Sequence, residues 1–166
     1  HGGVEKNLFL LTEFLSKNLS DITIITSNFD DKKYFSKRVK VLTLPKNFFK
    51  FKNRFFKNIL CTIILLKLIL NKRKFTLLSF NANLYATIIA KLFALKIIIR
   101  INASHKLWSK SFLKKSIFNF LFKYPNAIIV NSFDLKKEID KEFNIHSKCI
   151  LNPFNKKKML KYKKSK

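Results

Sequence analysis

The chain has 166 residues, 48% of them hydrophobic, and its 35 Lys and Arg against 9 Asp and Glu give a formal net charge of +26. This apolar content excludes a disordered basic tail, and the length favours one domain with a substantial core. The only glycines, Gly2 and Gly3, are adjacent, which excludes a Walker loop and a complete G-x-G-x-x-G dinucleotide fingerprint.

The first predicted element is an amphipathic helix over residues 4–19, where apolar side chains recur at helical spacing. Strands are expected over residues 21–26, which are rich in β-branched side chains, and over residues 39–44, which alternate apolar and polar and stop at Pro45. Residues 48–70 predict a loop that leads into a helix. The longest apolar run of that segment is too short to span a membrane.

Strands and helices alternate through the rest of the chain. The apolar run at residues 96–101 predicts a strand covered on both faces, and Ser132 predicts the N-cap of a helix over residues 134–143. The other predicted elements are strands over residues 75–80, 127–131 and 148–151, and helices over residues 84–95 and 111–123.

This alternation predicts right-handed crossovers and an α/β fold, with a Rossmann-like, mostly parallel sheet and helices on both faces. We expect one domain over residues 1–152 and a basic linker or truncated tail over residues 153–166.

In such sheets, ligands bind at the carboxyl ends of the strands. Three segments follow strands there, and their candidate residues are Arg100, Asn102, Ser104 and His105; Asn131 and Ser132; and Asn152 and Pro153. The Arg100 guanidinium can pair with a phosphate or a sugar hydroxyl, and His105 can donate a hydrogen bond or act as a base. The alternative for each segment is structural: a loop that satisfies its own backbone, a helix cap, or a proline turn.

The glycine pair precedes the first predicted helix. Glycines there let the backbone approach a ligand closely, and a helix N-terminus presents free N–H groups to an anion such as a diphosphate. The alternative is a tight turn in which Glu5 favours the helix dipole.

The positive charge is concentrated in the middle of the chain, because residues 32–133 contain 22 Lys and Arg and no Asp or Glu. Paired-carboxylate catalysis is therefore excluded in this block. The basicity favours a partner such as nucleic acid or anionic lipid, or it reflects a residue bias toward Lys, Ile, Phe and Asn. Residues 46–57, where Phe alternates with basic residues, are the candidate membrane-surface segment, and their alternative is a helix entry that buries its Phe side chains. No RNA-binding signature is present, which disfavours nucleic acid.

Four motifs in order, Gly2-Gly3-Val4-Glu5, Arg100 to His105, Asn126 to Ser132 and Ile150 to Phe154, resemble the N-terminal domain of bacterial family 4 glycosyltransferases. These are two-domain GT-B enzymes that transfer a sugar from a nucleotide donor with retention of configuration. The resemblance implies an enzyme of surface polysaccharide synthesis that uses a glycan or lipid-linked acceptor. It also implies that this sequence is part of a longer protein, lacks that domain's first strand, and is inactive alone.

The resemblance assigns roles to the candidate residues. Gly2 and Gly3 would face the donor diphosphate, and His105 would be the catalytic residue. Arg100, Asn102, Ser104, Asn131 and Ser132 would line the cleft for the sugar and the acceptor, and Asn152 and Pro153 would begin the link to the second domain. No metal or other cofactor is expected. The implied location is the cytoplasm or the inner face of the membrane; the alternative from another class is a non-catalytic basic module that binds anionic membrane or nucleic acid.

Overall fold

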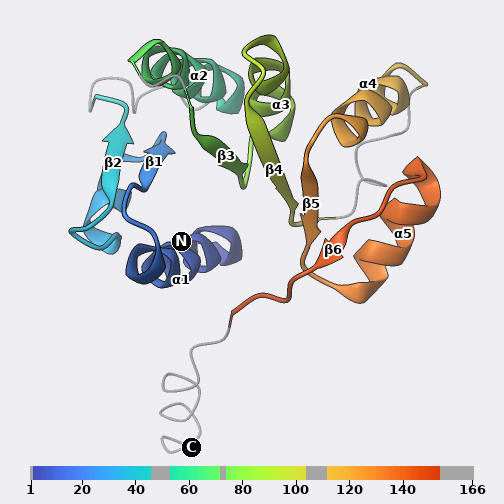
Figure 1. Ribbon diagram of the computed structural model, residues 1–166, viewed down its shortest axis with the longest axis horizontal. Helices are drawn as coiled ribbons and strands as arrows, with labels where there is room; N and C mark the ends of the chain where they lie inside the picture. The colour runs from blue at the N-terminus through green and yellow to red at the C-terminus, as the bar shows by residue number, and fades with distance from the viewer. Residues whose placement is uncertain (1, 46–52, 72–73, 104–111, 154–166) are drawn as a thin grey trace, which may run out of the picture.

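The computed structural model describes residues 2–45, 53–71, 74–103 and 112–153. Figure 1 shows the arrangement of its elements. The helices are α1 (Gly3–Asn18), the 3-10 helix η1 (Phe29–Tyr34), α2 (Arg54–Asn71), α3 (Asn83–Leu92), α4 (Phe112–Lys123) and α5 (Phe133–Phe143). The strands are β1 (Thr23–Thr26), β2 (Lys40–Thr43), β3 (Thr76–Ser79), β4 (Lys96–Ile101), β5 (Ala127–Val130) and β6 (Lys148–Cys149).

The strands form two sheets, and every pairing in them is parallel. One sheet pairs β1 with β2, and the other has the order β3-β4-β5-β6. The expected α/β architecture with parallel strands is therefore confirmed, but the division into two sheets was not predicted. Ile25 of β1 packs against the same core as the four-stranded sheet, so apolar contact joins the two sheets where no strand pairing is seen in the described residues.

Helices lie on both sides of the strands. Helices α2 to α5 follow one another along one side, and α1 lies on the opposite side of β3 and β4 from α2 and α3 (Figure 1). This order follows from right-handed crossovers, because successive connections that step across a sheet in one direction place their helices on the same face.

The core is centred on β4, the strand predicted to be covered on both faces. Ile97 and Ile99 are completely buried on one face, and Arg100 on the other face is only 4% exposed. From α5, side chains at a spacing of four residues reach the same core: Leu135, Ile139 and Phe143. The helical period therefore places one face of α5 against the sheet.

The ends of α5 are held by identifiable contacts. Ser132 is its N-cap, as predicted, and its hydroxyl accepts a hydrogen bond from Leu135 N at 3.2 Å. Near the other end, Asp140 accepts hydrogen bonds from Lys136 Nζ and from Ser147 N, the latter at 2.8 Å. Lys136 also donates to the carbonyl of Ser147 at 2.7 Å, so this group ties α5 to the segment that enters β6.

Two features of the local structure were not predicted. Residues 29–34 form a 3-10 helix capped by Asn28, whose side chain accepts a hydrogen bond from Asp30 N. Ala82 and Ala94 adopt left-handed backbone conformations at the two ends of α3, with φ of 52° and 50°. In the described residues, no helix is long and apolar enough to cross a membrane.

Candidate functional site

Four predicted site residues meet at the carboxyl ends of β4, β5 and β6, and we call Arg100, Asn102, Asn131 and Asn152 the strand-edge cluster. They are brought together because parallel neighbours end on the same side of a sheet. Hydrogen bonds connect all four, so the placement expected for these segments is observed. Their chemical roles stay predictions.

Arg100 is the centre of the strand-edge cluster. Its Nη2 donates to Asn152 Oδ1 at 2.9 Å and to the carbonyl of Ile150 at 3.2 Å, and its Nε donates to Asn102 Oδ1 at 3.3 Å. The guanidinium carbon lies 5.6 Å from the centre of the Phe80 ring, within the range of a cation–π contact. The planar fork of Arg thereby holds the chain that leaves β6 against the end of β4.

Asn102 and Asn131 extend the cluster across the sheet. Asn102 Nδ2 donates to the carbonyl of Phe80, after β3, at 3.0 Å. Asn131 Nδ2 donates to the carbonyl of Asn102 at 3.2 Å. Hydrogen bonds from side chains therefore join the carboxyl ends of four neighbouring strands, β3 to β6, and make this edge of the sheet rigid.

The electrostatics of Arg100 are unusual for a buried cation. Burial is the main effect on its side chain and lowers the pKa of the guanidinium below its usual range, while the nearby Cys149 opposes this shift. Within the described ranges, no Asp or Glu forms an ion pair with Arg100. Buried charges normally have a counter-charge, so this site is suited to an anionic group brought by a ligand.

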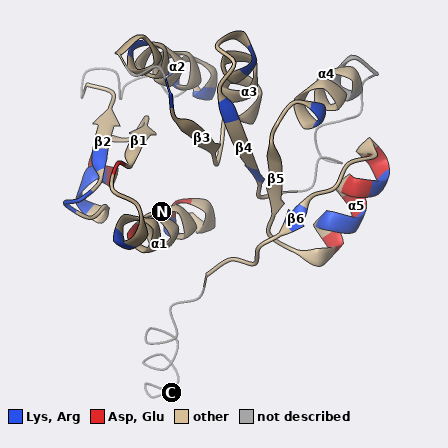
Figure 2. Ribbon diagram, viewed as in Figure 1, with Lys and Arg blue, Asp and Glu red and all other residues tan. Residues whose placement is uncertain are grey.

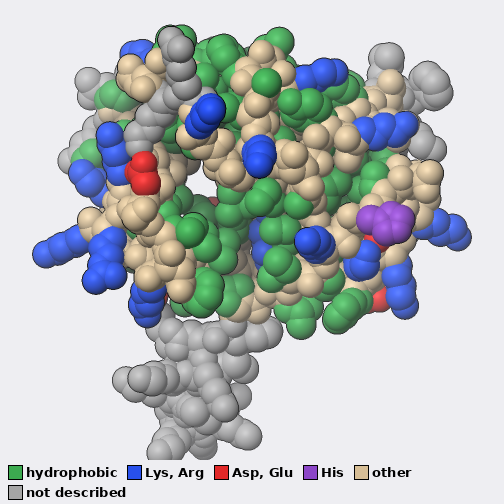
Figure 3. Space-filling model, in the orientation of Figure 1, with side chains coloured by type: hydrophobic (Ala, Val, Ile, Leu, Met, Phe, Trp, Pro, Cys, Tyr) green, Lys and Arg blue, Asp and Glu red, His purple; other side chains and the backbone are tan. Residues whose placement is uncertain are grey.

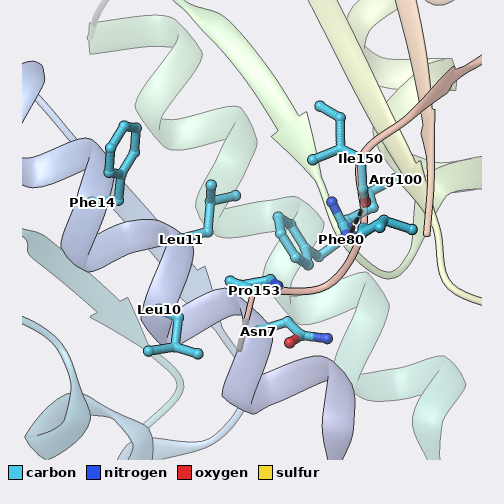
Figure 4. Close-up of a pocket in the computed structure, with 9 residues that line it drawn as sticks. Asn7, Leu10, Leu11, Phe14, Phe80, Arg100, Ile150 and Pro153 are labelled. Atoms are coloured by element: carbon cyan, nitrogen blue, oxygen red, sulfur yellow. Dashed lines mark hydrogen bonds between the residues drawn. The ribbon is translucent and has the colours of Figure 1, made fainter. Parts of the chain in front are cut away.

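A cavity of about 260 Å³ lies beside Arg100 (Figure 4). Phe80, Ile150 and Arg100 form one side, and Leu10 and Leu11 of α1 form the other. The remaining lining residues are Asn7, Phe14, Leu151 and Pro153. Its wall is mainly apolar, and among the described residues that line it only Arg100 is charged. Pro153 thus lies at this site, as expected of the segment that follows β6.

The glycine pair lies at the start of the helix that lines the cavity, but neither glycine lines it. Gly2 is the N-cap of α1, with an extended backbone at φ −75° and ψ 176° that any residue could adopt. A Cβ at Gly2 would lie 2.9 Å from Glu5 Oε2, and a Cβ at Gly3 would meet nothing within 4 Å.

The first turn of α1 lies close to the end of β1. Burial is the main cause of the raised pKa of Asp31, and the charge of Glu5, in the first turn of α1, raises it further. Asp31 itself accepts a hydrogen bond of 2.9 Å from Thr26, the last residue of β1. The glycines therefore begin a helix, α1, that starts near the carboxyl end of β1 and passes the carboxyl ends of β3 and β4.

Two of the predicted residues, Ser104 and His105, lie outside the described residues, as do residues 46–52 of the aromatic-basic segment. Ser132 acts as a helix cap next to the strand-edge cluster. The sequence argument missed the segment after β3, where Ser79 and Asn83 share a hydrogen bond of 2.7 Å and Asn83 donates to the carbonyl of Arg100. The same rule on strand ends, applied to β3, would have included it.

The model of the family described as Glycosyltransferase Family 4 matches residues 1–155. No curated protein matches the chain. The matched range contains every helix and strand of the described chain, and it contains the whole strand-edge cluster.

Proposed function

The chain belongs to glycosyltransferase family 4, and from this premise we propose that it forms the acceptor-side half of a GT-B enzyme. In this proposal the enzyme moves a sugar from a nucleotide-sugar donor to a glycan or lipid-linked acceptor, with retention of configuration, in the synthesis of a bacterial surface polysaccharide. The observation that carries the proposal is the strand-edge cluster, in which a buried guanidinium with no carboxylate partner among the described residues lies beside a cavity.

The glycine pair is proposed to face the donor diphosphate. The backbone at Gly3 is open, since a Cβ there would meet no atom within 4 Å, and the N-terminus of α1 presents free N–H groups. A diphosphate bound there would gain hydrogen bonds and the favourable end of the helix dipole. Such an arrangement accelerates transfer by stabilising charge on the leaving group.

The strand-edge cluster is proposed to position the transferred sugar and the acceptor. The side chains of Arg100, Asn102 and Asn131 are held by the network of hydrogen bonds described above, so little reorganisation is needed on binding. His105 follows this edge in the sequence and is proposed as the residue that contacts the reacting sugar. The apolar wall of the cavity beside Arg100 suits an acceptor that combines an apolar chain with an anionic group.

The test is nucleotide-sugar turnover by the enzyme in its natural full length. Release of the nucleoside diphosphate is followed with a panel of donors, and the anomeric configuration of the product is assigned by NMR. We expect Arg100→Lys to reduce turnover about 100-fold, since it loses the bidentate fork, and Glu142→Gln on α5 to leave it unchanged. If the full-length enzyme neither binds nor turns over any donor, the proposal is contradicted and a non-catalytic basic module is favoured.

A further inference from the structure

We propose that Asn83, the first residue of α3, is a positioning residue that holds Arg100 in place for binding of the acceptor. This inference rests on the proposed function, in which the strand-edge cluster positions the transferred sugar and the acceptor. Asn83 is not among the described residues that line the cavity beside Arg100, so it would act on the acceptor only through Arg100.

Two asparagine side chains connect β3 and β4 beyond the last strand pair. The register pairs end at Ser79 of β3, and Arg100 is the residue of β4 that follows the last pair. Asn83 Nδ2 donates to the carbonyl of Arg100 at 3.0 Å. In the opposite direction, Asn102 Nδ2 donates to the carbonyl of Phe80 at 3.0 Å. Side-chain amides therefore give these two carbonyls the donors that strand pairing would otherwise supply.

The amide of Asn83 has one orientation in this network. The carbonyl of Arg100 can only accept a hydrogen bond, so it faces the amide nitrogen of Asn83. The amide oxygen then faces the hydroxyl of Ser79, which is only 6% exposed and donates to it at 2.7 Å. Buried Ser79 thus fixes the side chain that fixes the backbone of Arg100.

Local helix preferences alone would use this asparagine differently. Asn is among the best N-cap residues, because its side chain accepts from the free N–H groups of the first turn. The N-cap of α3 is instead Ala82, which has a left-handed φ of 52° and makes no side-chain hydrogen bond. Asn83 follows it and bonds to β4. Departure from a local preference for the sake of a distant contact is typical of functional sites.

The contact is made by a neutral side chain, which leaves the charge of Arg100 uncompensated. Figure 2 shows basic residues and no acidic ones on β3, α3 and β4, in agreement with the absence of Asp and Glu from residues 32–133. The amide of Asn83 therefore holds the backbone of Arg100 and keeps its guanidinium available to an anionic group of a ligand.

The two asparagine contacts set the relative position of two groups in the cavity wall. Arg100 and Phe80 both line the cavity, and the guanidinium carbon lies 5.6 Å from the ring centre. In Figure 3, hydrophobic side chains surround a hollow where Figure 1 places α1 beside the ends of β3 and β4. Without Asn83, the end of β4 is free to shift, and a displacement of about 1 Å at a reacting site can lower turnover about 100-fold.

The test compares Michaelis constants of variants of the full-length enzyme. Asn83→Ala removes the contact, and Asn83→Asp keeps the shape and the acceptor for Ser79 but has no N–H for the carbonyl of Arg100. Both should raise the KM for the acceptor about tenfold and leave the KM for the donor within about twofold of the wild type. A merely structural contact would instead lower kcat with the folded fraction and leave both KM values unchanged.

The matched control is Asn126→Ala, at the other end of β4. Asn126 Oδ1 accepts a hydrogen bond from Ile97 N at 2.8 Å, so this variant removes an asparagine contact of the same kind. It should lower stability in urea unfolding as Asn83→Ala does, yet leave both KM values unchanged.

A second measurement, on the chain itself, needs no substrate. Burial of Arg100 and the hydrogen bond from its Nε to Asn102 Oδ1 protect the Nε proton from exchange with water. This exchange is followed by NMR, with the signal assigned from its loss in Arg100→Lys. It should become about tenfold faster in both Asn83 variants and stay unchanged in Asn126→Ala.

The outcomes separate this inference from the proposed function. If the wild type neither binds nor turns over any donor, the proposed function is contradicted and the positioning role falls with it. If the wild type is active, an unchanged acceptor KM in both Asn83 variants, an equal rise in Asn126→Ala, or unchanged exchange of the Arg100 proton overturns the positioning role alone. If neither Asn83 variant folds, Ser79→Ala, which removes the donor to Asn83 Oδ1, decides in their place and should also raise the acceptor KM.

Discussion

Arg100 and Asn152 are far apart in the sequence, yet Arg100 Nη2 donates a hydrogen bond of 2.9 Å to Asn152 Oδ1. This contact joins the central strand β4 to the segment that leaves β6. In the GT-B architecture proposed for the full enzyme, that segment leads toward the second domain. The same guanidinium therefore would set both the shape of the cavity and the direction in which the chain leaves the sheet.

A double-mutant cycle should measure the coupling between these two residues. Asn152→Ala removes one acceptor and should lower the free energy of unfolding by about 1 kcal/mol. Arg100→Lys keeps the charge but cannot reach Asn102, Ile150 and Asn152 together, and should cost about 2 kcal/mol. In urea unfolding, the double variant should lose less than the sum of the single losses. Strictly additive losses would show that the contact contributes nothing.

Substitution of the N-cap should separate the structural and proposed binding roles of Ser132. Ser132→Ala should lower the free energy of unfolding by about 1 kcal/mol, because Leu135 N loses its partner. Ser132→Asp keeps a cap and should unfold like the wild type. If Ser132 lines the sugar cleft, S132D should still lose turnover in the full-length enzyme. Full activity of S132D would restrict Ser132 to capping.

Gly3 offers a substitution with no structural cost. Alanine at Gly3 meets no atom within 4 Å, and in the first turn of a helix it should raise the free energy of unfolding by up to about 1 kcal/mol. If the donor diphosphate approaches the backbone here, Gly3→Ala should weaken nucleotide-sugar binding about tenfold, as measured by calorimetry. If Gly3→Ala raises the free energy of unfolding but leaves donor affinity unchanged, the proposal that the glycine pair binds the donor is contradicted.

A glycine in place of Ala94, in the left-handed turn after α3, should stabilise the fold. Ala94 has φ of 50°, a region that L-residues adopt at a cost and glycine adopts freely. Ala94→Gly should therefore raise the free energy of unfolding by about 0.5–1 kcal/mol in urea titrations. The control is Ala90→Gly, inside the same helix and completely buried, which should lower it by about 1 kcal/mol or more. If Ala94→Gly lowers the free energy of unfolding, the account in which the left-handed backbone at Ala94 is strained is contradicted.

The Asp140 carboxylate should make stability depend on acid pH. Burial alone would raise the pKa of Asp140, but the hydrogen bonds from Lys136 and Ser147 outweigh it and hold the pKa below its usual value of 3.8. The folded chain therefore binds this proton less readily than the unfolded chain. The contribution to stability is complete above pH 3.8 and is lost as the pH falls through the lower pKa of the folded state.

Asp140→Asn should lower the free energy of unfolding by about 2 kcal/mol at pH 7, because a neutral amide accepts more weakly from Lys136 and Ser147. The difference from the wild type should shrink as the pH falls below 3.8. Urea unfolding across that range checks both expectations. Lys137→Gln, at an exposed position of α5, is the control and should follow the wild type. A difference that stays constant with pH would contradict this account.

Much of the fold could be predicted from the sequence by itself, because local patterns reflect local physics. Helical spacing of apolar residues indicated α1, a β-branched run indicated β1, and a continuous apolar run indicated β4. Ser132 was recognised as the cap of α5 from its type and position. The rule that parallel strands end on one side also predicted that Arg100, Asn131 and Asn152 would lie together. These inferences need only periodicity and the handedness of the chain.

Only the tertiary structure decided how those residues are used. No pattern in the sequence shows that Arg100 is bonded to the segment after β6, that α1 closes a cavity against Phe80, or that β1 and β2 form a sheet of their own. The exposed apolar side of α2 was equally hidden, because a run such as 59–70 is apolar on every side and its composition does not say which side the core covers. These features depend on contacts between segments that are far apart in the sequence, and only the packing of the whole chain determines which of those contacts form.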